Sequence, residues 1–211
     1  RAKGIPVVER SVMLGMVTRR YPNPVAVSGT HGKTTTTALI TQILINAGID
    51  PTAIIGGKLP FIGGNGRVGK SDTIVCEACE YVDTFLQLYP AISVILNVDG
   101  DHLDYFGTVD NIIKSFHQFA QQTSKLLVVN GDDANSMKAV SGITNAEIIT
   151  FGLKSTDDYY AENIADTKEA KERFSVMKHG KKLADVTLSI PGKHNIYNAL
   201  AAFAVADQMG V

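Results

Sequence analysis

The chain has 211 residues, of which 45% are hydrophobic and 19% are charged, a balance typical of folded globular proteins and not of disordered ones. Its 20 basic and 21 acidic side chains leave a net charge of −1, which argues against a nucleic acid or a membrane surface as a partner. The apolar runs are far shorter than the ~20 residues that cross a bilayer, and the first residues show no signal-peptide pattern. We therefore expect a cytoplasmic protein.

The first segment is expected to hold one strand and one helix. Residues 5–8 form a short apolar run that predicts a strand, and Ser11 can cap a helix over residues 11–20, where apolar side chains recur at helical spacing. The sequence Tyr-Pro-Asn-Pro follows at residues 21–24. Because two prolines stop a helix and extend the chain, this stretch is interpreted as a domain linker.

From residue 25 onward the pattern alternates between strand and helix. Strands are predicted at residues 25–28, 53–55, 73–76, 92–97, 126–130 and 147–151, and helices at residues 34–47, 108–122 and 133–140. The strands are continuous apolar runs, which is typical of a parallel sheet covered by helices on both faces. The predicted fold class is therefore α/β, with a mostly parallel sheet of the phosphate-loop type.

The pattern changes after residue 151. Three strand-like segments at residues 159–166, 173–178 and 183–190 follow one another without a helix, which predicts a small antiparallel sheet near the C-terminal end. An alanine-rich helix is expected over residues 195–209. One earlier window, residues 56–69, holds six glycines and is predicted to be a long functional loop without regular structure.

The strongest chemical signal lies between the predicted strand at residues 25–28 and the helix at residues 34–47. Glycines allow backbone N–H groups to close around a phosphate, a helix start adds partial positive charge, a lysine reaches the terminal phosphates, and the next hydroxyl binds Mg²⁺. A glycine-rich turn capped by a threonine is the alternative. The predicted nucleotide contacts are Gly29, Thr30, His31, Gly32, Lys33, Thr34 and Thr35.

Polar side chains follow two other predicted strands. Glu77 comes directly after the strand at residues 73–76, and a cluster of Asn, Asp and His side chains runs from Asn97 to His102. Alone, Glu77 could be a solvent-facing strand end and His102 a capping residue. Ligands of open parallel sheets bind beyond the carboxyl ends of the strands, however, so the coincidence of these motifs with the phosphate loop predicts one metal and nucleotide site.

Two asparagines open the last predicted helix. Asn195 and Asn198 are three residues apart and therefore point to one side, and an Asn amide can donate and accept at once, as adenine requires. Helix capping by Asn195 is the alternative, but it does not account for Asn198. Cys76 and Cys79 form a lone C-x-x-C, for which redox chemistry or half a zinc site is disfavoured because no second cysteine pair exists.

Together the motifs resemble the Mur ligases, the ATP-dependent amide-forming enzymes of peptidoglycan precursor synthesis. The resemblance is carried by GTHGKTTTT at residues 29–37, CEACEY at 76–81, NVDGDHLDYF at 97–106, NGDD at 130–133 and PGKHNIYN at 191–198. It implies that ATP and Mg²⁺ are the cofactors. It also implies that a substrate carboxylate attacks the γ-phosphate to give an acyl phosphate, which an amine then attacks as phosphate leaves.

The resemblance implies roles for individual side chains. Lys33, Glu77 and His102 would be catalytic: Lys33 would stabilise the transferring phosphoryl group, Thr34 and Glu77 would hold Mg²⁺, and His102 would support a second metal. The residues that would hold adenine are His194, Asn195 and Asn198. Cys79 stands where related members often carry Asp, so no catalytic role is assigned to it.

The substrates and the domain division are also implied by the resemblance. His31 and the glycine-rich window before Glu77 resemble the branch that joins L-alanine to UDP-N-acetylmuramate, with a muropeptide-recycling branch as the close alternative. A P-loop ATPase or switch without ligase activity is the second alternative, although the base-reading N/T-K-x-D motif of switch GTPases is not found. Residues 1–22 are expected to be a remnant of an N-terminal UDP-sugar-binding domain and linker, and residues 23–211 the central ATP-binding domain, with the C-terminal domain absent.

Overall fold

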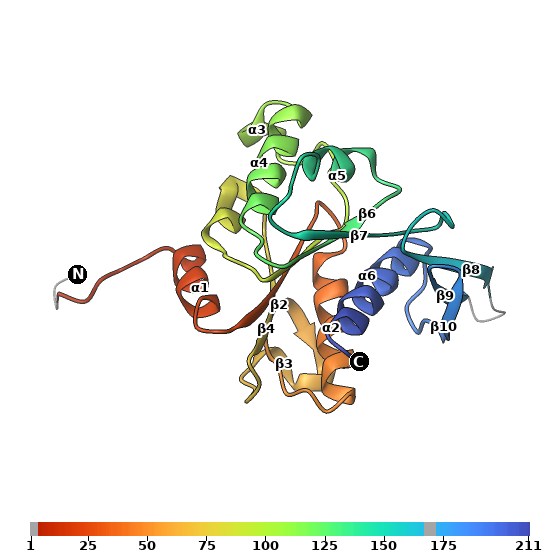
Figure 1. Ribbon diagram of the computed structural model, residues 1–211. Coiled ribbons are helices and arrows are strands. Elements are labelled where there is room, and N and C mark those ends of the chain that lie inside the picture. Colours follow the sequence, from red (N-terminus) through yellow and green to blue (C-terminus); the bar gives the residue numbers. More distant parts are fainter. Residues whose placement is uncertain (1–3, 167–171) are drawn as a thin grey trace.

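A computed structural model describes residues 4–166 and 172–211, and within these ranges ten strands form one sheet with helices on both faces (Figure 1). The strands are β1 (Asn23–Ser28), β2 (Thr52–Leu59), β3 (Gly64–Arg67), β4 (Thr73–Glu77), β5 (Ile92–Ile95), β6 (Leu126–Asn130), β7 (Glu147–Gly152), β8 (Tyr159–Asp166), β9 (Glu172–Lys178) and β10 (Lys181–Thr187). The helices are α1 (Arg10–Thr18), α2 (Lys33–Asn46), α3 (Leu103–Phe106), α4 (Val109–Gln121), α5 (Ala134–Ala139) and α6 (His194–Gln208), with 3-10 helices η1 (Pro60–Ile62) and η2 (Tyr81–Gln87). The predicted α/β class is confirmed.

Strand β1 lies in the interior of the sheet. It pairs in parallel with β4 on one side and with β5 on the other, within the order β10-β9-β8-β7-β6-β5-β1-β4-β2-β3. Val25, Ala26 and Val27 are at most 1% exposed, because helices cover both faces of the strand. Since successive strands go to opposite sides of β1, the carboxyl ends of β1, β4 and β5 border one crevice, where ligands of such sheets bind.

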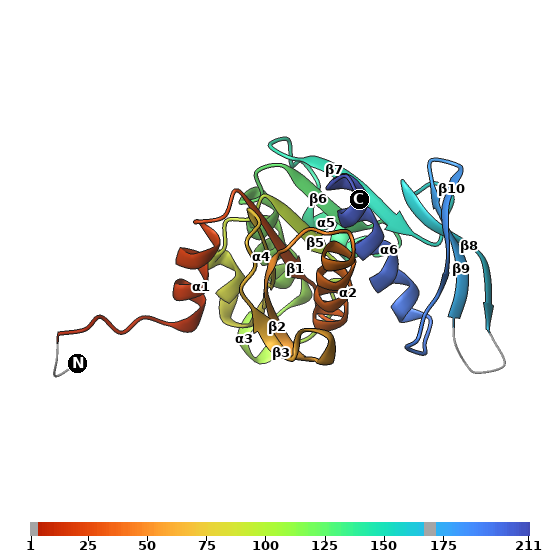
Figure 2. The same ribbon diagram turned by 90° about the horizontal axis from the view of Figure 1, so that it is seen from below.

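Two apolar layers hold the helices to the sheet. On one face α2 and α6 lie side by side (Figure 2); α2 contributes Ile40 and Leu44 to the core, and the buried alanines of α6 allow close approach. On the other face, Phe85 of η2 stacks on Phe119 of α4 with ring centroids 4.8 Å apart. None of the helices in the described ranges is both long and apolar enough to cross a bilayer.

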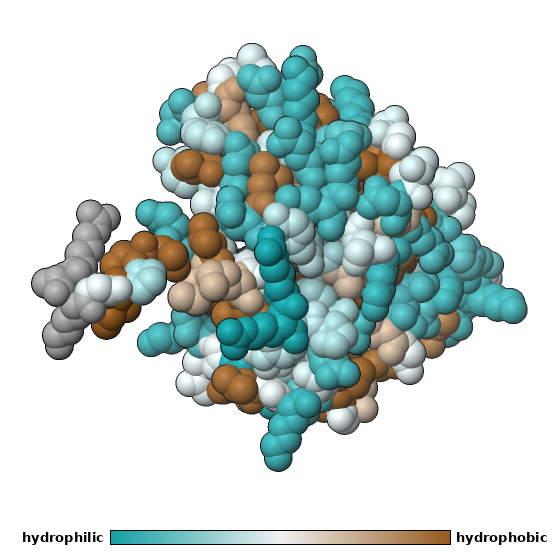
Figure 3. Space-filling model, turned by 60° about the vertical axis from the view of Figure 1, so that its left-hand side comes forward, coloured by the Kyte–Doolittle hydropathy of each residue, from teal (hydrophilic) through white to brown (hydrophobic). Residues whose placement is uncertain are grey.

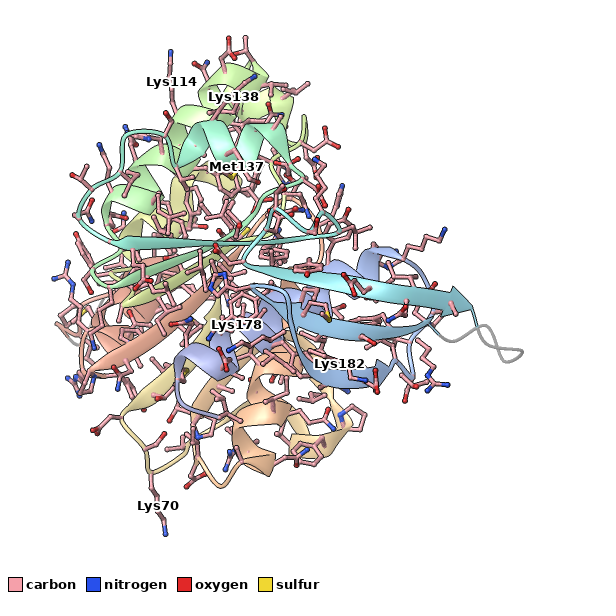
Figure 4. The ribbon with its side chains drawn as sticks, turned by 45° about the vertical axis from the view of Figure 1, so that its right-hand side comes forward. Lys70, Lys114, Met137, Lys138, Lys178 and Lys182 are labelled. Carbon is pink, nitrogen blue, oxygen red and sulfur yellow. The ribbon has the colours of Figure 1, made fainter. Side chains whose placement is uncertain are left out.

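The three strands after residue 158 pair antiparallel, as predicted. They do not form a separate sheet, however, because β8 also joins β7 through a short parallel pairing of Phe151 with Tyr159 and Gly152 with Tyr160. Strand β10 ends at Thr187, before the predicted end at residue 190. The Nζ atom of Lys178 on β9 lies 2.6 Å from Asp207 Oδ2 on α6, so this extension is also tied to the last helix (Figure 4).

The predicted strand at residues 5–8 is wrong. This segment is irregular, and Ile5 and Val7 are 65% and 70% exposed. Figure 3 shows it as an apolar projection from the body of the molecule. No strand among the described residues pairs with it, and an apolar run without a hydrogen-bonding partner for its backbone does not become a strand.

The glycine-rich window is also more regular than predicted. β2 continues through Gly56 to Leu59, η1 turns the chain, and β3 returns antiparallel to β2. Main-chain pairing needs no side chain, and a Cβ added to Gly56 would lie 2.6 Å from Glu77 Oε2, so the absent side chain leaves room for that carboxylate. The predicted linker at residues 21–24 is shorter than expected, because Pro24 already belongs to β1.

Candidate nucleotide-binding site

The loop between β1 and α2 depends on two glycines. Gly29 and Gly32 have φ angles of +137° and +89°, a region that residues with a side chain rarely adopt. Space is also limited: a Cβ on Gly29 would lie 2.9 Å from Leu96 Cβ, and one on Gly32 would lie 2.4 Å from Asn198 Oδ1. The loop therefore turns tightly enough to present its backbone N–H groups at the start of α2.

Two adjacent hollows lie at this loop. The smaller, of about 270 Å³, is lined by Thr30, His31, Gly32, Lys33, Thr34 and Thr35 at the start of α2. The larger, of about 380 Å³, is lined by His31, Gly32, Leu96, Asn97, Asn130, His194, Tyr197 and Asn198. His31 and Gly32 border both hollows. Six of the seven predicted phosphate contacts thus line one space, from which Gly29 is missing, and two of the predicted adenine contacts border the next.

Lys33 folds back over the loop. Its Nζ atom lies 2.5 Å from the Gly29 carbonyl oxygen, 3.2 Å from the Thr30 carbonyl oxygen and 3.0 Å from Glu80 Oε2. Glu80 is only 2% exposed. Sequence reasoning did not single out Glu80, although it is the second glutamate of CEACEY.

Thr34 and Glu77 meet at the ends of α2 and β4. Thr34 Oγ1 donates to Glu77 Oε2 at 3.1 Å, and Glu77 Oε1 accepts from the Gly56 N–H at 2.5 Å. A hydroxyl and a carboxylate are hard oxygen donors, the type Mg²⁺ prefers, so this pair fits that ion. No group of three or more His, Cys, Asp or Glu side chains in residues 4–166 and 172–211 is arranged to hold a metal, so Mg²⁺ here would need ligands from phosphate and water as well.

Asn97, at the end of β5, is bonded to the loop in both directions. Its Oδ1 accepts from the His31 N–H at 2.8 Å, and its Nδ2 donates to the His31 carbonyl oxygen at 3.0 Å. The Asp99 N–H donates to Thr30 Oγ1 at 2.9 Å. The NVDGDH segment therefore fixes the loop conformation. Its position after a strand did not predict this role.

His102 lies at the start of α3. Its backbone is left-handed, with a φ of +54°. Its ring centroid is 4.6 Å from that of Tyr81, and its Nε2 is 3.8 Å from Asp101 Oδ2. The structure thus places His102 against the segment that follows Glu77, and its support of a second metal stays a prediction.

The two asparagines of α6 are linked to one another. Asn198 Nδ2 donates to Asn195 Oδ1 at 2.9 Å, and Asn195 Nδ2 donates to the Pro191 carbonyl oxygen at 2.7 Å. Asn198 Oδ1 accepts from Thr36 Oγ1 at 3.2 Å. Asn198 borders the larger hollow, whereas Asn195 orients Asn198 and bonds the turn before α6, which begins without a side-chain cap. The contact of Asn195 with adenine stays a prediction.

Two further side chains limit the chemistry of the site. Burial, together with the nearby Asp132, raises the pKa of Tyr197 to about 12, so this wall of the larger hollow is neutral. Burial also raises the pKa of the Cys76 thiol to about 12, so at neutral pH Cys76 is not the thiolate that redox chemistry needs.

A model of the Mur ligase middle domain matches residues 27–206. The chain belongs to the Mur ligase family. Among the curated relatives of this Mur ligase chain, the UDP-N-acetylmuramate–L-alanine ligase of Caldanaerobacter subterraneus subsp. tengcongensis is 50% identical over 210 residues, which are 99% of this chain and 45% of that protein. The corresponding ligase of Alkaliphilus metalliredigens is 43% identical over 210 residues, again 99% of this chain and 45% of that protein. The chain thus spans less than half the length of these relatives.

Solved structures agree with this Mur ligase assignment. The UDP-N-acetylmuramate–alanine ligase of Thermotoga maritima superposes with a TM-score of 0.79 at 30% identity, over 93% of this chain and 44% of that one. A Neisseria meningitides ligase described as UDP-N-acetylmuramate:L-alanyl-γ-D-glutamyl-meso-diaminopimelate ligase superposes with a TM-score of 0.87 at 28% identity, over 100% of this chain and 68% of that one.

Proposed function

We propose that the chain is the nucleotide-binding part of an ATP-dependent ligase that joins L-alanine to UDP-N-acetylmuramate through an acyl phosphate, in peptidoglycan precursor synthesis. The observation that carries this proposal is the 50% identity with an L-alanine ligase over nearly the whole chain, together with a phosphate loop and Glu77 at one sheet edge. Because the chain spans 45% of that relative, we assign the UDP-sugar and amino-acid sites to other parts of the protein.

The chemistry of the site is alignment and charge neutralisation. A carboxylate is a poor electrophile, so the reaction needs a good leaving group, and the protein contributes positioned charges. Lys33 would meet the transferring phosphoryl group, and backbone N–H groups of residues 29–34 would hold the remaining phosphate oxygens. Thr34 and Glu77 would hold Mg²⁺, which neutralises charge on the β- and γ-phosphates when bound.

The larger hollow would take the nucleoside. Asn198 presents an amide at its border, Tyr197 provides a neutral aromatic wall, and His194 lies at the first turn of α6. This placement supports the proposal that adenine lies between α6 and the ends of β5 and β6. The predicted cytoplasmic location, and the prediction that neither nucleic acid nor a membrane is a partner, belong to the same proposal.

The muropeptide-recycling activity is the second candidate. The Neisseria ligase, whose description names a tripeptide, has the higher TM-score of the two solved relatives, 0.87 against 0.79. The nucleotide site does not distinguish the two activities, because the added amine is expected to bind outside the phosphate loop. The choice of L-alanine therefore depends on the sequence identity.

A single assay separates these functions. A full-length protein that contains this chain would be incubated with ATP, Mg²⁺, UDP-N-acetylmuramate and either labelled L-alanine or the tripeptide. We expect a labelled nucleotide-sugar product with L-alanine. Product with the tripeptide alone would favour the recycling activity, and ATP hydrolysis without either product would indicate a simple ATPase.

The same assay tests Lys33. The Lys33→Ala variant should lose at least ~10²-fold in activity, by analogy with the loss of one donor to a developing oxyanion, because a charge-assisted contact to the transferring phosphoryl group disappears. Activity within a few-fold of wild type would contradict the assignment of the phosphate loop.

A further inference from the structure

We propose that Glu80 is a positioning residue of this site, whose buried carboxylate holds the ammonium group of Lys33 at the mouth of the phosphate loop. The inference deepens the proposed function and rests on it. Glu80 lies outside the predicted ligand set; it contacts Lys33 directly and precedes a strained turn.

The contact itself is close: Lys33 donates a hydrogen bond to Glu80 Oε1, whereas Oε2 is buried and has no hydrogen-bond partner among the described residues. Lys33 Nζ lies 3.1 Å from Glu80 Oε1 and 3.0 Å from Oε2. The two side chains are 18% and 3% exposed, so water does not screen the pair as it screens a surface ion pair. A buried carboxylate of this kind needs a fixed positive partner, and among the described residues Lys33 forms the ion pair with it.

Burial of Glu80 also limits how far Lys33 can move. An ammonium group has three N–H donors, and here they face Glu80 and the carbonyl oxygens of Gly29 and Thr30. A phosphate oxygen must take one of these donors. Releasing Glu80 would leave an uncompensated buried charge, which is strongly unfavourable, whereas releasing one loop carbonyl is not. We infer that Lys33 keeps Glu80 and exchanges a carbonyl for the phosphate.

The backbone after Glu80 is bent in a way that sequence alone does not favour. Val82 and Asp83 are consecutive left-handed residues, with φ angles of +52° and +54°, a costly conformation for a β-branched side chain. Such strain persists where surrounding contacts impose it, and it is often found at functional sites.

Asp83 supplies these contacts. Its Oδ2 accepts from the Tyr105 hydroxyl at 2.7 Å, its Oδ1 accepts from Ser115 Oγ, and its N–H donates to the Glu80 carbonyl oxygen at 3.0 Å. Tyr105 and Ser115 belong to α3 and α4 respectively. Side chains of α3 and α4 therefore hold the turn that directly follows Glu80, whose carboxylate contacts Lys33.

A double-mutant cycle tests the assignment. Glu80→Gln, Lys33→Ala and the double variant would be made in the full-length protein that contains this chain, with Glu172→Gln as control, since Glu172 is another buried glutamate, 5% exposed on β9. We expect Glu80→Gln to lower kcat by ~10-fold or more, with a smaller rise in the KM for ATP. In the Lys33→Ala background it should change the rate by less than about threefold. Glu172→Gln should leave both constants unchanged.

The opposite pattern would overturn the proposal. If Glu80→Gln lowered the rate by the same factor with and without Lys33, or did not lower it at all, Glu80 would not act through Lys33. Should Glu80→Gln fail to fold, Glu80→Asp keeps the negative charge but moves the carboxylate away from Lys33, and the same cycle applies to that variant. If the wild-type protein forms no product, the proposed function fails. The same cycle is then measured on the ratio of the affinities for ATP and ADP. Glu80→Gln should reduce this ratio only when Lys33 is present.

Discussion

At Glu77, one carboxylate bonds both the Thr34 hydroxyl and the Gly56 N–H. Glu77→Gln keeps the shape and an oxygen for Gly56 but removes the charge that a hard cation needs. We expect activity to fall by at least ~10-fold, a typical loss when a metal site is weakened, and to recover in part at high Mg²⁺. Titration of activity against Mg²⁺ would show this, with thermal unfolding as the control for folding. An unchanged Mg²⁺ dependence would mean that Glu77 is structural.

Asn198 borders the larger hollow and also forms hydrogen bonds within the protein. Asn198→Ala should weaken ATP binding by ~1–3 kcal/mol, the range for an Asn–adenine pair, and should weaken GTP binding less. Because Thr36 and Asn195 would also lose a partner, the free energy of unfolding should fall by about 1–3 kcal/mol. Calorimetric titration with both nucleotides separates the effects, since an equal loss for ATP and GTP would indicate a folding defect alone.

Thr34 and Glu77 were predicted from the sequence and Glu80 was not, because different features of the fold determine their positions. Thr34 and Glu77 come together because parallel strands end at a common edge, a regularity that follows from the strand pattern. Glu80 reaches Lys33 across 47 positions of sequence, from a segment in which the next residues but one, Val82 and Asp83, adopt left-handed conformations. Neither residue type predicts that conformation, so the buried ion pair could not be derived from the sequence.

At the scale of elements, the interior of the sheet was predictable and its edges were not. Strands β1, β4, β5 and β6 are apolar runs whose burial on both faces follows from their composition, and β7 extends the pattern although its first residue is exposed. The edge hairpin of β2 and β3 is formed by main-chain pairing through glycines, which have no side-chain pattern to detect. Residues 5–8 have an apolar pattern but lack a neighbouring strand. Composition alone therefore predicted a loop where the β2–β3 hairpin lies and a strand where residues 5–8 are irregular.

Helix α6 is fixed to the antiparallel strands through Asp207. Burial alone would raise the pKa of this carboxyl, but hydrogen bonds from Lys178 and Tyr159 outweigh burial and hold the pKa below its usual value. A carboxyl with a lowered folded-state pKa contributes stability that is present above the unfolded-state pKa, ~3.9 for Asp, and is lost as the pH falls toward and below the folded-state value.

We therefore expect Asp207→Asn to lower the free energy of unfolding by about 1–3 kcal/mol near pH 7, the range for hydrogen bonds to charged groups. Denaturant unfolding at pH 7 and near pH 3 would measure it, and the difference from wild type should shrink at the lower pH. Glu147→Gln, at an exposed position of β7, should stay within about 0.5 kcal/mol of wild type at both. A difference that grew on acidification would refute the account of Asp207.

For the molecule as a whole, the phosphate loop, Glu77 and the larger hollow, which together form the proposed nucleotide site, all lie within the 211 residues. The isolated chain should therefore fold and bind ADP or ATP weakly with Mg²⁺, yet form no UDP-N-acetylmuramoyl-L-alanine. On the proposal that other parts of the protein hold the sugar carboxylate and the amine, the isolated chain would not supply the alignment contribution of up to ~7–11 kcal/mol. Labelled L-alanine incorporation by the isolated chain, compared with the full-length protein, measures this. Equal turnover by the two would show that the 211 residues hold both substrates.

The depth of β1 in the sheet has a consequence for synthesis of the chain. β1 is synthesised before its neighbours β4 and β5. Asn97, the hydrogen-bond partner of His31, follows it by 66 positions, and Asn198, the partner of Thr36, follows it by 162 positions. At ~5–20 residues per second, the last interval is roughly ten to thirty seconds. During it the apolar layer that α6 completes in the folded protein lacks that helix. A ligand stabilises only the native state that binds it. We therefore expect a nucleotide to stabilise the chain against unfolding only after α6 has left the ribosome.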